Sequence, residues 1–325
     1  MGIKKNEVLL SVAIPTLNRR KLLEITLSQL IPQIDKYNNI ELIVSDNCST
    51  DDTHLLFENN GKFLKDNITY RRFDEKVDAD NSFKRTVDLT NGKYVVLFGD
   101  DDIPLPGFID EVIKTLIKYS EISILYVNRI VGDENMQNCS FIPHINQTFG
   151  TYLYNISDFI KEFTHWPGFV TCLIFSKKLW NNTSDLISDF SGYDFLFRIY
   201  LGSKDSQACF LASPLILQRR GIQSWKKFWP TYWLVSMPGL LSELEKKNVT
   251  QKALEHWQLF EVSEKRFFID NFVAKAYGYS INSDFWIKSR KFQKSKKRKI
   301  ISIFIQFLLP VFIAKFIYSK SNKMT

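Results

Sequence analysis

The 325-residue sequence lacks the glycine motifs of two common nucleotide-binding folds. No GxGxxG follows the first apolar stretch, and no GxxxxGK[ST] occurs anywhere in the chain. These motifs bring backbone amides close to phosphates, so their absence argues against a dinucleotide-binding fold and against a P-loop NTPase. The four cysteines are scattered, with no CxxC pair and no zinc-like spacing to histidine. We therefore expect reduced cytoplasmic thiols and no zinc site.

Acidic residues are absent from residues 288–325, called the tail below, which hold eleven Lys and Arg. The chain has a formal charge of +8, so residues 1–287 carry 32 basic against 35 acidic side chains and are slightly acidic. A basic tail on a near-neutral body predicts a charged surface as partner and no nucleic acid. The N-terminus has only a strand-length apolar run, so we expect no signal peptide.

The tail also lacks an apolar run long enough for a comfortable bilayer crossing. Eight basic side chains in residues 288–299 are followed by an uncharged run, 300–314. Ser302, Gln306 and Pro310 recur every four residues and leave a broad apolar face of Ile, Phe and Leu. This pattern predicts a polybasic amphipathic anchor that lies on an anionic membrane surface. A terminal helix packed on the body or at a dimer contact is the alternative.

Three consecutive carboxylates directly follow one of the expected strands. An apolar run from Tyr94 to Phe98, bounded by Gly92 and Gly99, predicts a buried parallel strand that ends at Asp100–Asp102. Three like charges need a positive partner, and a hard divalent cation such as Mg²⁺ or Mn²⁺ prefers oxygen ligands. The alternative is a solvated acidic turn that caps the next helix.

Apolar segments of strand length alternate with amphipathic helical segments through the first 130 residues. This alternation predicts a parallel, right-handed α/β sheet, and the acids would lie in the loops where such sheets bind ligands. The expected strands are 8–14, 40–44, 68–73, 94–98 and 122–127.

The segments Val12–Arg19, Ile43–Thr53 and Phe98–Asp102 together resemble the family 2 glycosyltransferases of GT-A fold, most closely their abequosyltransferase-like branch of O-antigen and capsule enzymes. The resemblance implies a Rossmann-like, mostly parallel sheet flanked by helices, with a C-terminal helical region and the basic amphipathic tail. The expected divisions are a glycosyltransferase domain with a nucleotide-sugar half and an acceptor half, a helical accessory region, and the tail: 1–130 and 131–225, 226–287, and 288–325.

The resemblance also implies roles for individual residues. Asp100 and Asp102 match the outer acids of the family's DXD signature and would hold the divalent cation. Asp194 resembles the base that deprotonates the acceptor, although a structural helix pair with Arg198 is the alternative. Trp166 and Trp225 would border the acceptor. The residues expected to contact the nucleotide sugar are Pro15, Thr16, Asn18, Asp46, Asp80, Asn81, Asp100, Asp101 and Arg220.

The implied activity is metal-assisted transfer of a hexose or deoxyhexose from a nucleotide-diphosphate sugar to a polyprenyl-linked glycan, with inversion at the anomeric carbon. The enzyme would act at the cytoplasmic face of a bacterial inner membrane. A sugar-phosphate nucleotidyltransferase could use the same acids, but Pro15-Thr16-Leu17-Asn18 lacks the glycines of its usual loop. A non-catalytic membrane-associated scaffold with a related fold is the third interpretation.

Overall fold

The computed structural model divides the chain into two compact units. The first unit comprises residues 1–159, 165–186 and 198–222, and the second comprises residues 160–164, 187–197 and 223–325. The structure describes residues 7–58, 61–141, 149–164, 168–183, 186, 190–221, 227–258, 264–293 and 295–321.

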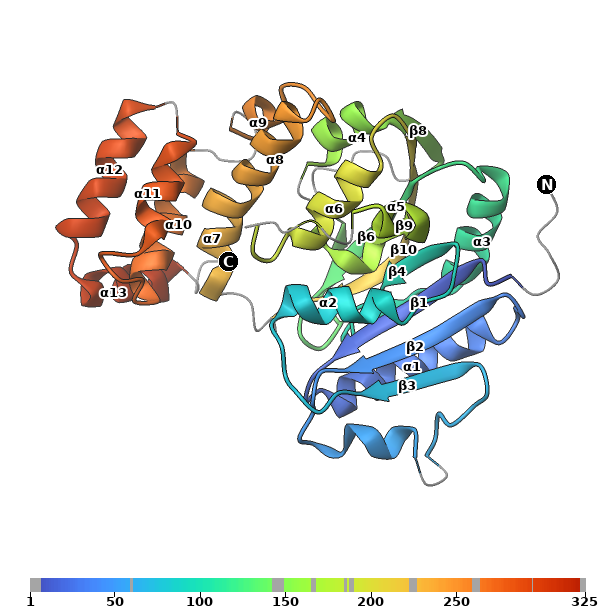
Figure 1. The fold of residues 1–325 in the computed structure, drawn as a ribbon. Helices are drawn as coiled ribbons and strands as arrows, with labels where there is room; N and C mark the ends of the chain where they lie inside the picture. The colour runs from blue at the N-terminus through green and yellow to red at the C-terminus, as the bar shows by residue number, and fades with distance from the viewer. Residues whose placement is uncertain are drawn as a thin grey trace. The chain divides into compact units, whose positions relative to one another are not determined.

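A single mixed sheet organises the first unit (Figure 1). Its strands, among the described residues, are β1 Leu10–Thr16, β2 Ile40–Asp46, β3 Ile68–Arg72, β4 Tyr94–Leu97, β5 Ile103–Pro104, β6 Ile124–Gly132, β7 Ser140–Phe141, β8 Thr151–Asn155, β9 Leu173–Ser176 and β10 Gln207–Arg219. They are ordered β3-β2-β1-β4-β9-β6-β10-β5, with β7 paired to β6 and β8 paired to β10.

The four strands at one end of the sheet, β3, β2, β1 and β4, pair in parallel, as the sequence analysis expected. β1 pairs in parallel with β2 and β4, and β2 pairs in parallel with β3. Strand β9 then runs antiparallel to both β4 and β6, and β6 is again parallel to β10. The α/β fold with a central sheet flanked by helices is confirmed, but the sheet is mixed, because β5, β7, β8 and β9 run antiparallel to the strands they pair with.

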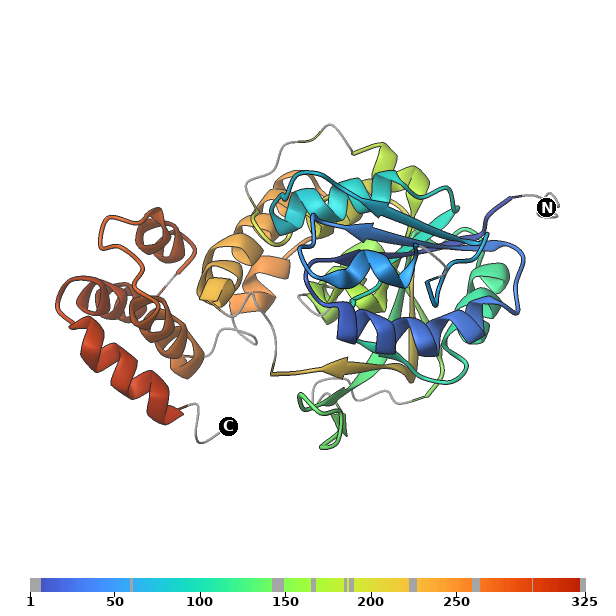
Figure 2. The ribbon, with the colours of Figure 1, turned by 90° about the horizontal axis from the view of Figure 1, so that it is seen from below.

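Almost every side chain of β1, β2 and β4 is buried. Runs of Val, Ile and Leu that are buried on both faces are typical of parallel strands covered by helices. Helices α1 and α2 lie on opposite faces of the sheet (Figure 2). The helices of the first unit include α1 Arg20–Ile34, α2 Ala79–Asp88, α3 Phe108–Lys118 and α5 Lys177–Asn181, with a 3₁₀ turn at Asp52–Leu56 and another at Val170–Cys172.

The described part of the second unit is helical. Helices α4 Ile156–Phe163 and α6 Asp194–Gly202 have residues in both units. The remaining helices are α7 Trp229–Thr231, a π-helical turn at Tyr232–Ser236, α8 Met237–Lys246, α9 Ala253–His256, α10 Glu264–Ala276, α11 Asp284–Lys291, α12 Lys296–Phe307 and α13 Val311–Ser321.

Helix α12 buries polar side chains and exposes apolar ones. Ser302 Oγ donates to Asn271 Oδ1 at 3.0 Å, and Gln306 Nε2 donates to the Ile281 carbonyl at 2.6 Å. The Arg290 guanidinium donates to Gln306 Oε1 at 2.7 Å. Large apolar side chains of α12, α13 and the link between them are exposed: Ile300, Ile303, Phe304, Phe307, Leu308, Val311, Phe312, Ile313 and Phe316. In the part of the chain that the structure describes, none of the helices combines the length and apolar character that a bilayer crossing requires.

Candidate functional site

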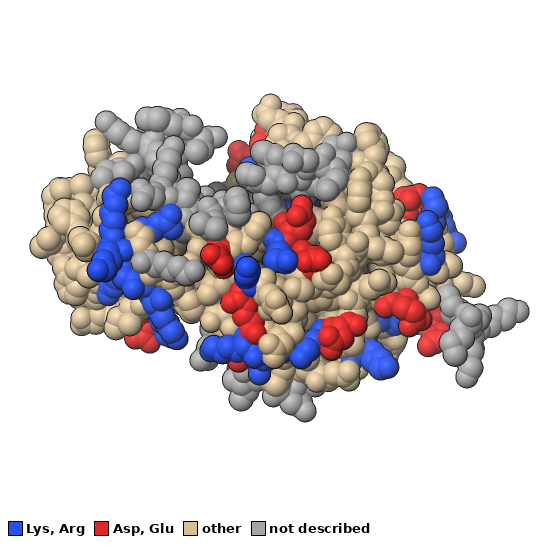
Figure 3. All heavy atoms as spheres, turned by 90° about the horizontal axis from the view of Figure 1, so that it is seen from above, with Lys and Arg blue, Asp and Glu red and all other residues tan. Residues whose placement is uncertain are grey.

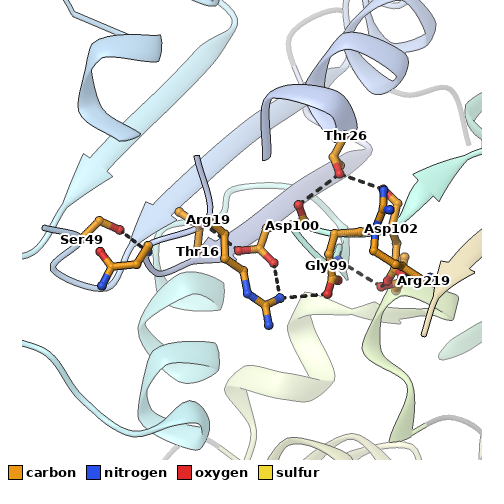
Figure 4. Close-up of polar contacts among 11 residues, drawn as sticks. Thr16, Arg19, Thr26, Ser49, Gly99, Asp100, Asp102 and Arg219 are labelled. Atoms are coloured by element: carbon orange, nitrogen blue, oxygen red, sulfur yellow. Dashed lines mark hydrogen bonds and ion pairs between the residues drawn. The ribbon is translucent and has the colours of Figure 1, made fainter. Parts of the chain in front are cut away.

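The loops after β1, β2 and β4 lie at one edge of the sheet because these strands are parallel. Thr16, the last residue of β1, is in register with Asp46, the last residue of β2. On the other side of β1, Ala13 is in register with Leu97, the last residue of β4. The acids that follow β4 therefore lie beside the loop that follows β1, where open α/β sheets bind ligands (Figure 4).

Asp100 is held by the end of β1 and by residues that follow it. Its carboxylate is 7% exposed and accepts a 2.8 Å hydrogen bond from Thr16 Oγ1 and a 2.9 Å hydrogen bond from Arg19 Nη1. Its backbone carbonyl accepts from the Thr26 hydroxyl at 3.2 Å. Asp100 thus points toward the end of β1.

The Arg19 guanidinium bridges two acids of the triplet. Its Nη1 atom lies 2.9 Å from Asp100 Oδ1 and 2.9 Å from Asp101 Oδ2. Burial lowers the pKa of Arg19, but the charges of Asp100 and Asp101 and their hydrogen bonds raise it above its ordinary value. The sequence analysis expected a metal ion as the neutralising charge, and the structure shows that an arginine already contributes.

Asp102 points to the opposite side of the loop from Arg19 (Figure 4). It is 2% exposed, its Oδ2 accepts from Thr171 Oγ1 at 2.6 Å, and its Oδ1 accepts from the Arg219 backbone amide at 3.2 Å. A Cβ at position 99 would lie 2.6 Å from Asp102 Oδ2, so a larger residue than Gly99 would displace this carboxylate. The carboxylate is therefore enclosed by β4, β10 and the turn before β9.

Two of the three acids are poorly neutralised by the protein. Burial, opposed by Arg19, raises the pKa of Asp100 to about 6. Burial and the neighbouring charge of Asp101 raise the pKa of Asp102 to about 7, against the hydrogen bonds from Thr171 and the Arg219 amide. One guanidinium is thus insufficient for three carboxylates, and negative charge remains available to a further cation.

The donor set of this triplet fits a hard divalent cation. Oxygens of Asp100 and Asp101 converge on a single cationic nitrogen, and carboxylate oxygens are the ligands that Mg²⁺ and Mn²⁺ prefer. Among the described residues, no three His, Cys, Asp or Glu side chains form a ready-made metal cage. A cation here would accordingly be held by one or two carboxylates, with water and substrate phosphate oxygens completing its coordination.

Asp46 is fully buried and its two oxygens already have partners. The Ser49 amide donates to Oδ1 at 2.8 Å, and the Tyr70 hydroxyl donates to Oδ2 at 2.7 Å. Burial, followed by the hydrogen bond to Asp46, raises the pKa of Tyr70. Asp46 thus ties the loop after β2 to β3, whereas the following 3₁₀ turn is capped by Asp51. A contact of Asp46 with the nucleotide sugar stays a prediction.

Asn18 joins the loop after β1 to the loop after β2. It adopts a left-handed conformation with φ 54°, and its Oδ1 accepts from the Thr50 amide at 2.6 Å. Its own amide donates to Ser49 Oγ at 2.8 Å. Pro15 and Thr16 precede it at the end of β1, Pro15 half-buried and Thr16 buried. The predicted residues Pro15, Thr16 and Asn18 are thus brought together beside the acids.

Asp80 and Asn81 lie in the first turn of α2. Asn81 is exposed and its amide donates to Asp78 Oδ1 at 2.9 Å, whereas Asp80 is half-buried. Arg220 follows β10 directly and is exposed. Partial desolvation and the charge of Arg129 lower the pKa of Arg220. The roles of Asp80, Asn81 and Arg220 toward a nucleotide sugar stay predictions.

Asp194 is the first residue of α6 and belongs to the second unit. Gly192, just before it, has φ 80°, and a Cβ there would come within 2.4 Å of the Tyr232 ring, so glycine is required. Arg198 is buried and its guanidinium donates to the carbonyl oxygens of Thr183 and Leu186. The role of Asp194 as a base stays a prediction. Trp166 and Trp225 lie outside the described residues.

The sequence analysis did not identify Arg19, Thr171 or Arg219 as site residues. It assigns a site role to Arg220 but none to its neighbour Arg219. In the structure Arg219 makes the contacts with the triplet, its amide to Asp102 and its Nε to the Asp101 carbonyl at 3.1 Å. The available signal was the position of Arg19, directly after a strand-end loop.

Comparison with sequence families and curated proteins identifies relatives. The family model "Glycosyl transferase family 2" matches residues 11–195. Abequosyltransferase RfbV of Salmonella typhimurium is 40% identical over 99 residues, which is 29% of this chain and 28% of that protein. The GalNAc(5)-diNAcBac-PP-undecaprenol beta-1,3-glucosyltransferase of Campylobacter jejuni is 33% identical over 106 residues, 32% of this chain and 33% of the relative. The matches therefore span about a third or less of each relative's length.

Solved structures share the fold. S. aureus TarS 1–349 in complex with UDP-GlcNAc superposes with a TM-score of 0.59 at 13% identity, covering 98% of this chain and 92% of that one. The mannosyltransferase PcManGT from Pyrobaculum calidifontis, in complex with GDP-Man and Mn²⁺, gives a TM-score of 0.51 at 11% identity, with 98% and 89% coverage. At these identities the likeness is one of fold.

Proposed function

The chain belongs to glycosyl transferase family 2, and from this membership we propose that it transfers a hexose or deoxyhexose from a nucleotide-diphosphate sugar to a hydroxyl of a lipid-linked glycan in surface polysaccharide synthesis. The observation that carries the proposal is the convergence of Thr16 and Arg19 on Asp100 at the carboxyl edge of the sheet. A buried, partly neutralised carboxylate at this edge suits binding of a donor together with a cation.

Asp100 and Asp102 would hold Mn²⁺ or Mg²⁺, with the Asp101 carboxylate beside them. Held by these carboxylates, a divalent cation would supply positive charge to the departing nucleoside diphosphate. The nucleotide sugar would lie along the ends of β1, β2 and β10 and the start of α2. Its contacts would come from Pro15, Thr16, Asn18, Asp46, Asp80, Asn81, Asp101 and Arg220.

Asp194 would act as the general base. A carboxylate that accepts the acceptor hydroxyl's proton raises the nucleophilicity of its oxygen as the bond to the anomeric carbon forms. Attack on the face opposite the leaving diphosphate inverts the configuration at that carbon. The half-buried position of Asp194 at the start of α6 supports this assignment. Gly192, whose φ and contact with the Tyr232 ring require a glycine, stands two residues before it. Trp166 and Trp225 are proposed to border the acceptor.

The second partner that we propose is the anionic cytoplasmic face of a bacterial inner membrane, bound through the tail. Figure 3 shows Lys and Arg gathered over the C-terminal helices, and exposed basic side chains at the start of α12 include Lys296, Lys297 and Lys299. The exposed apolar side chains of α12 and α13 follow them in the sequence. Basic residues around an apolar helix face match an anionic interface. The Campylobacter relative is named for a PP-undecaprenol substrate, which would lie at such a surface.

A thermal-shift screen of UDP-, dTDP-, GDP- and CDP-sugars, with and without Mn²⁺, tests the donor. A ligand at a hundred times its Kd stabilises the folded protein by about 2.7 kcal/mol, so one donor class should raise the melting temperature, and more so with Mn²⁺. We expect Asp102→Ala to fold, to lose the Mn²⁺-dependent shift and to lose transfer. Asp110→Ala, which removes a carboxylate from the exposed Lys36–Asp110 pair, is the matched control and should keep both.

The same assays separate the three interpretations of the sequence. Mn²⁺-dependent release of a nucleoside diphosphate supports a glycosyltransferase. Formation of a nucleotide sugar from a sugar phosphate and a nucleoside triphosphate would identify a nucleotidyltransferase. A protein that binds membranes but neither shifts with any donor nor turns one over would be a scaffold. Full transfer by Asp102→Ala would rule out the proposed metal role.

A further inference from the structure

Arg19 occupies the point at which two carboxylates of the acid triplet converge. Asp100 Oδ1 and Asp101 Oδ2 lie 2.9 Å from the same nitrogen, Arg19 Nη1. The two oxygens belong to consecutive residues after β4, whereas Arg19 stands 81 and 82 residues earlier in the chain. Pairing of β1 with β4 brings them together. The acid triplet therefore already has a positively charged partner, the Arg19 guanidinium.

A metal ion bound to both of these oxygens would displace this guanidinium. A divalent cation of the Mg²⁺ type binds carboxylate oxygen at about 2.0–2.1 Å, so an ion bound to both oxygens would lie close to the position of Nη1. Two positive charges at such a separation also repel each other strongly in a partly buried site. Asp100 is one of the two proposed ligands of the ion, so binding of the ion through Asp100 Oδ1 requires the Arg19 side chain to leave.

The structure lets the Arg19 side chain move while its backbone stays fixed. The backbone is held on both sides, because the Asn18 amide donates to Ser49 Oγ at 2.8 Å and the Arg19 carbonyl accepts from the Leu23 amide at 3.0 Å. The side chain is 24% exposed and lies at the N-terminus of α1 without capping it. Arg219 differs, because it is buried and its guanidinium donates to the carbonyls of Asp101 and Glu134.

We propose that Arg19 is a displaceable counter-cation, which holds Asp100 and Asp101 until donor and metal arrive together and then pairs with the donor's diphosphate. This inference rests on the proposed function, because it presumes a metal-bound nucleotide sugar at the triplet. It assigns Arg19 two successive anionic partners, the carboxylates and then the diphosphate. Metal affinity is consequently low without nucleotide, since only the fraction of molecules with Arg19 released can bind the ion.

Mn²⁺ binding to the full chain, followed by electron paramagnetic resonance of the free ion, tests the proposal without any turnover. Arg19→Gln removes the competing charge and should bind Mn²⁺ alone at least about tenfold more tightly than the unmodified protein. Arg20→Gln is the matched control, because Arg20 pairs with Asp52 at 3.4 Å on the surface and should leave the affinity unchanged. The double variant Arg19→Gln/Asp100→Asn should lose the gain, which places the ion at the triplet.

Repeating the titration with UDP, dTDP, GDP and CDP in turn measures the coupling. The effective nucleotide should tighten Mn²⁺ binding by a larger factor in the unmodified protein than in Arg19→Gln, because the variant has no guanidinium to release. An Arg19→Gln protein that folds, as its circular dichroism spectrum reports, and binds Mn²⁺ no more tightly than the unmodified protein overturns the proposal. If the unmodified protein in that case still binds Mn²⁺ in the presence of nucleotide, the proposed function keeps its metal ion and only the role of Arg19 is lost. If no variant binds Mn²⁺ under any condition, both ideas fail.

Discussion

The Thr171 hydroxyl donates a 2.6 Å hydrogen bond to Asp102 Oδ2 and accepts a 3.0 Å hydrogen bond from the Gly99 amide. Thr171 is fully buried in the turn that precedes β9. One hydroxyl thus fixes both the backbone at the start of the acid loop and the carboxylate at its end. The antiparallel strand β9 contributes to the site through this residue.

Thr171→Val should make Asp102 harder to ionise. The lost hydrogen bond stabilises the charged carboxylate, so its pKa, already raised to about 7, should rise further, by about one unit for a bond of 1.5 kcal/mol to a charged group. At pH 7 and Mn²⁺ well below saturation, we expect kcat/KM to fall about fivefold, as the ionised fraction of Asp102 falls, and to recover as the pH increases. Thr171→Ser keeps the hydroxyl and should retain the original pH profile; an unchanged profile in Thr171→Val would show that the bond does not control Asp102.

Metal-free protein should lose stability as the pH rises through neutrality. The pKa values of Asp100 and Asp102 are about 6 and about 7 in the folded protein, above the ordinary value of 3.8. The folded state therefore binds these protons more tightly than the unfolded state, and this contribution is complete below pH 3.8 and is lost as the pH passes 6 to 7. In EDTA, the melting temperature should fall between pH 5 and pH 8.

Asp102→Asn tests whether this loss of stability comes from the buried Asp102 carboxylate and not from other titrating groups. The neutral amide avoids the buried charge, so the variant should melt roughly 2–4 °C above the unmodified protein at pH 8 and close to it at pH 5. Asp110→Asn is the opposite case, because hydrogen bonds from Tyr37 and Lys36 lower the pKa of Asp110. That variant should show no gain at pH 8, and a gain equal to that of Asp102→Asn would contradict the burial argument.

Strand ends were predictable from the sequence, whereas the partners of the acids were not. The apolar run before Asp100 and the boundaries of β1 and β2 follow from hydrophobic pattern, and β1 and β2 begin and end within about two residues of the expected segments. Arg19 and Thr171 reach the triplet from 81 and 69 residues away. No local pattern encodes such contacts, because they depend on strand order and on the antiparallel insertion of β9.

The choice between Arg219 and Arg220 has a more specific explanation. Neighbouring residues of a strand point to opposite faces, so counting along β10 should identify the inward side chain. The pairing of β10 with β6 shifts register between Leu211 and Pro214 and again between Pro214 and Ile216. Each irregularity breaks the alternation, and the sequence alone does not show where these shifts fall.

Asp194→Asn should abolish transfer and preserve donor binding. General-base assistance typically contributes 10²–10⁴-fold, so we expect kcat to fall by at least about 100-fold. The Mn²⁺-dependent thermal shift with the donor should persist because the predicted role concerns the acceptor alone. Asp205→Asn is the matched control, since Asp205 is an exposed acid with φ 63° that asparagine tolerates. Loss of the donor shift in Asp194→Asn would contradict the assignment.

Membrane binding should depend on the exposed apolar face of the tail. Deletion of 288–325 should move the protein to the soluble fraction. The deletion also removes the hydrogen-bond partners of Asn271 and Lys275, so point variants test the membrane contact more specifically. Phe304 and Phe312 are 51% and 72% exposed. Glutamate at both positions leaves the buried polar contacts of α12 intact, places two negative charges on the face and should abolish flotation with vesicles of anionic phospholipid.

Phe149→Glu provides the comparison because Phe149 is 77% exposed and lies in the first unit. It should float like the unmodified protein. Binding should weaken as salt rises and should fall on vesicles of neutral phosphatidylcholine, because each well-placed Lys or Arg adds about 1 kcal/mol only at an anionic surface. If the doubly substituted protein still floats, the lipid contact lies elsewhere. If it instead changes from dimer to monomer in solution, the face is a contact between two copies of the chain, the alternative that the sequence left open.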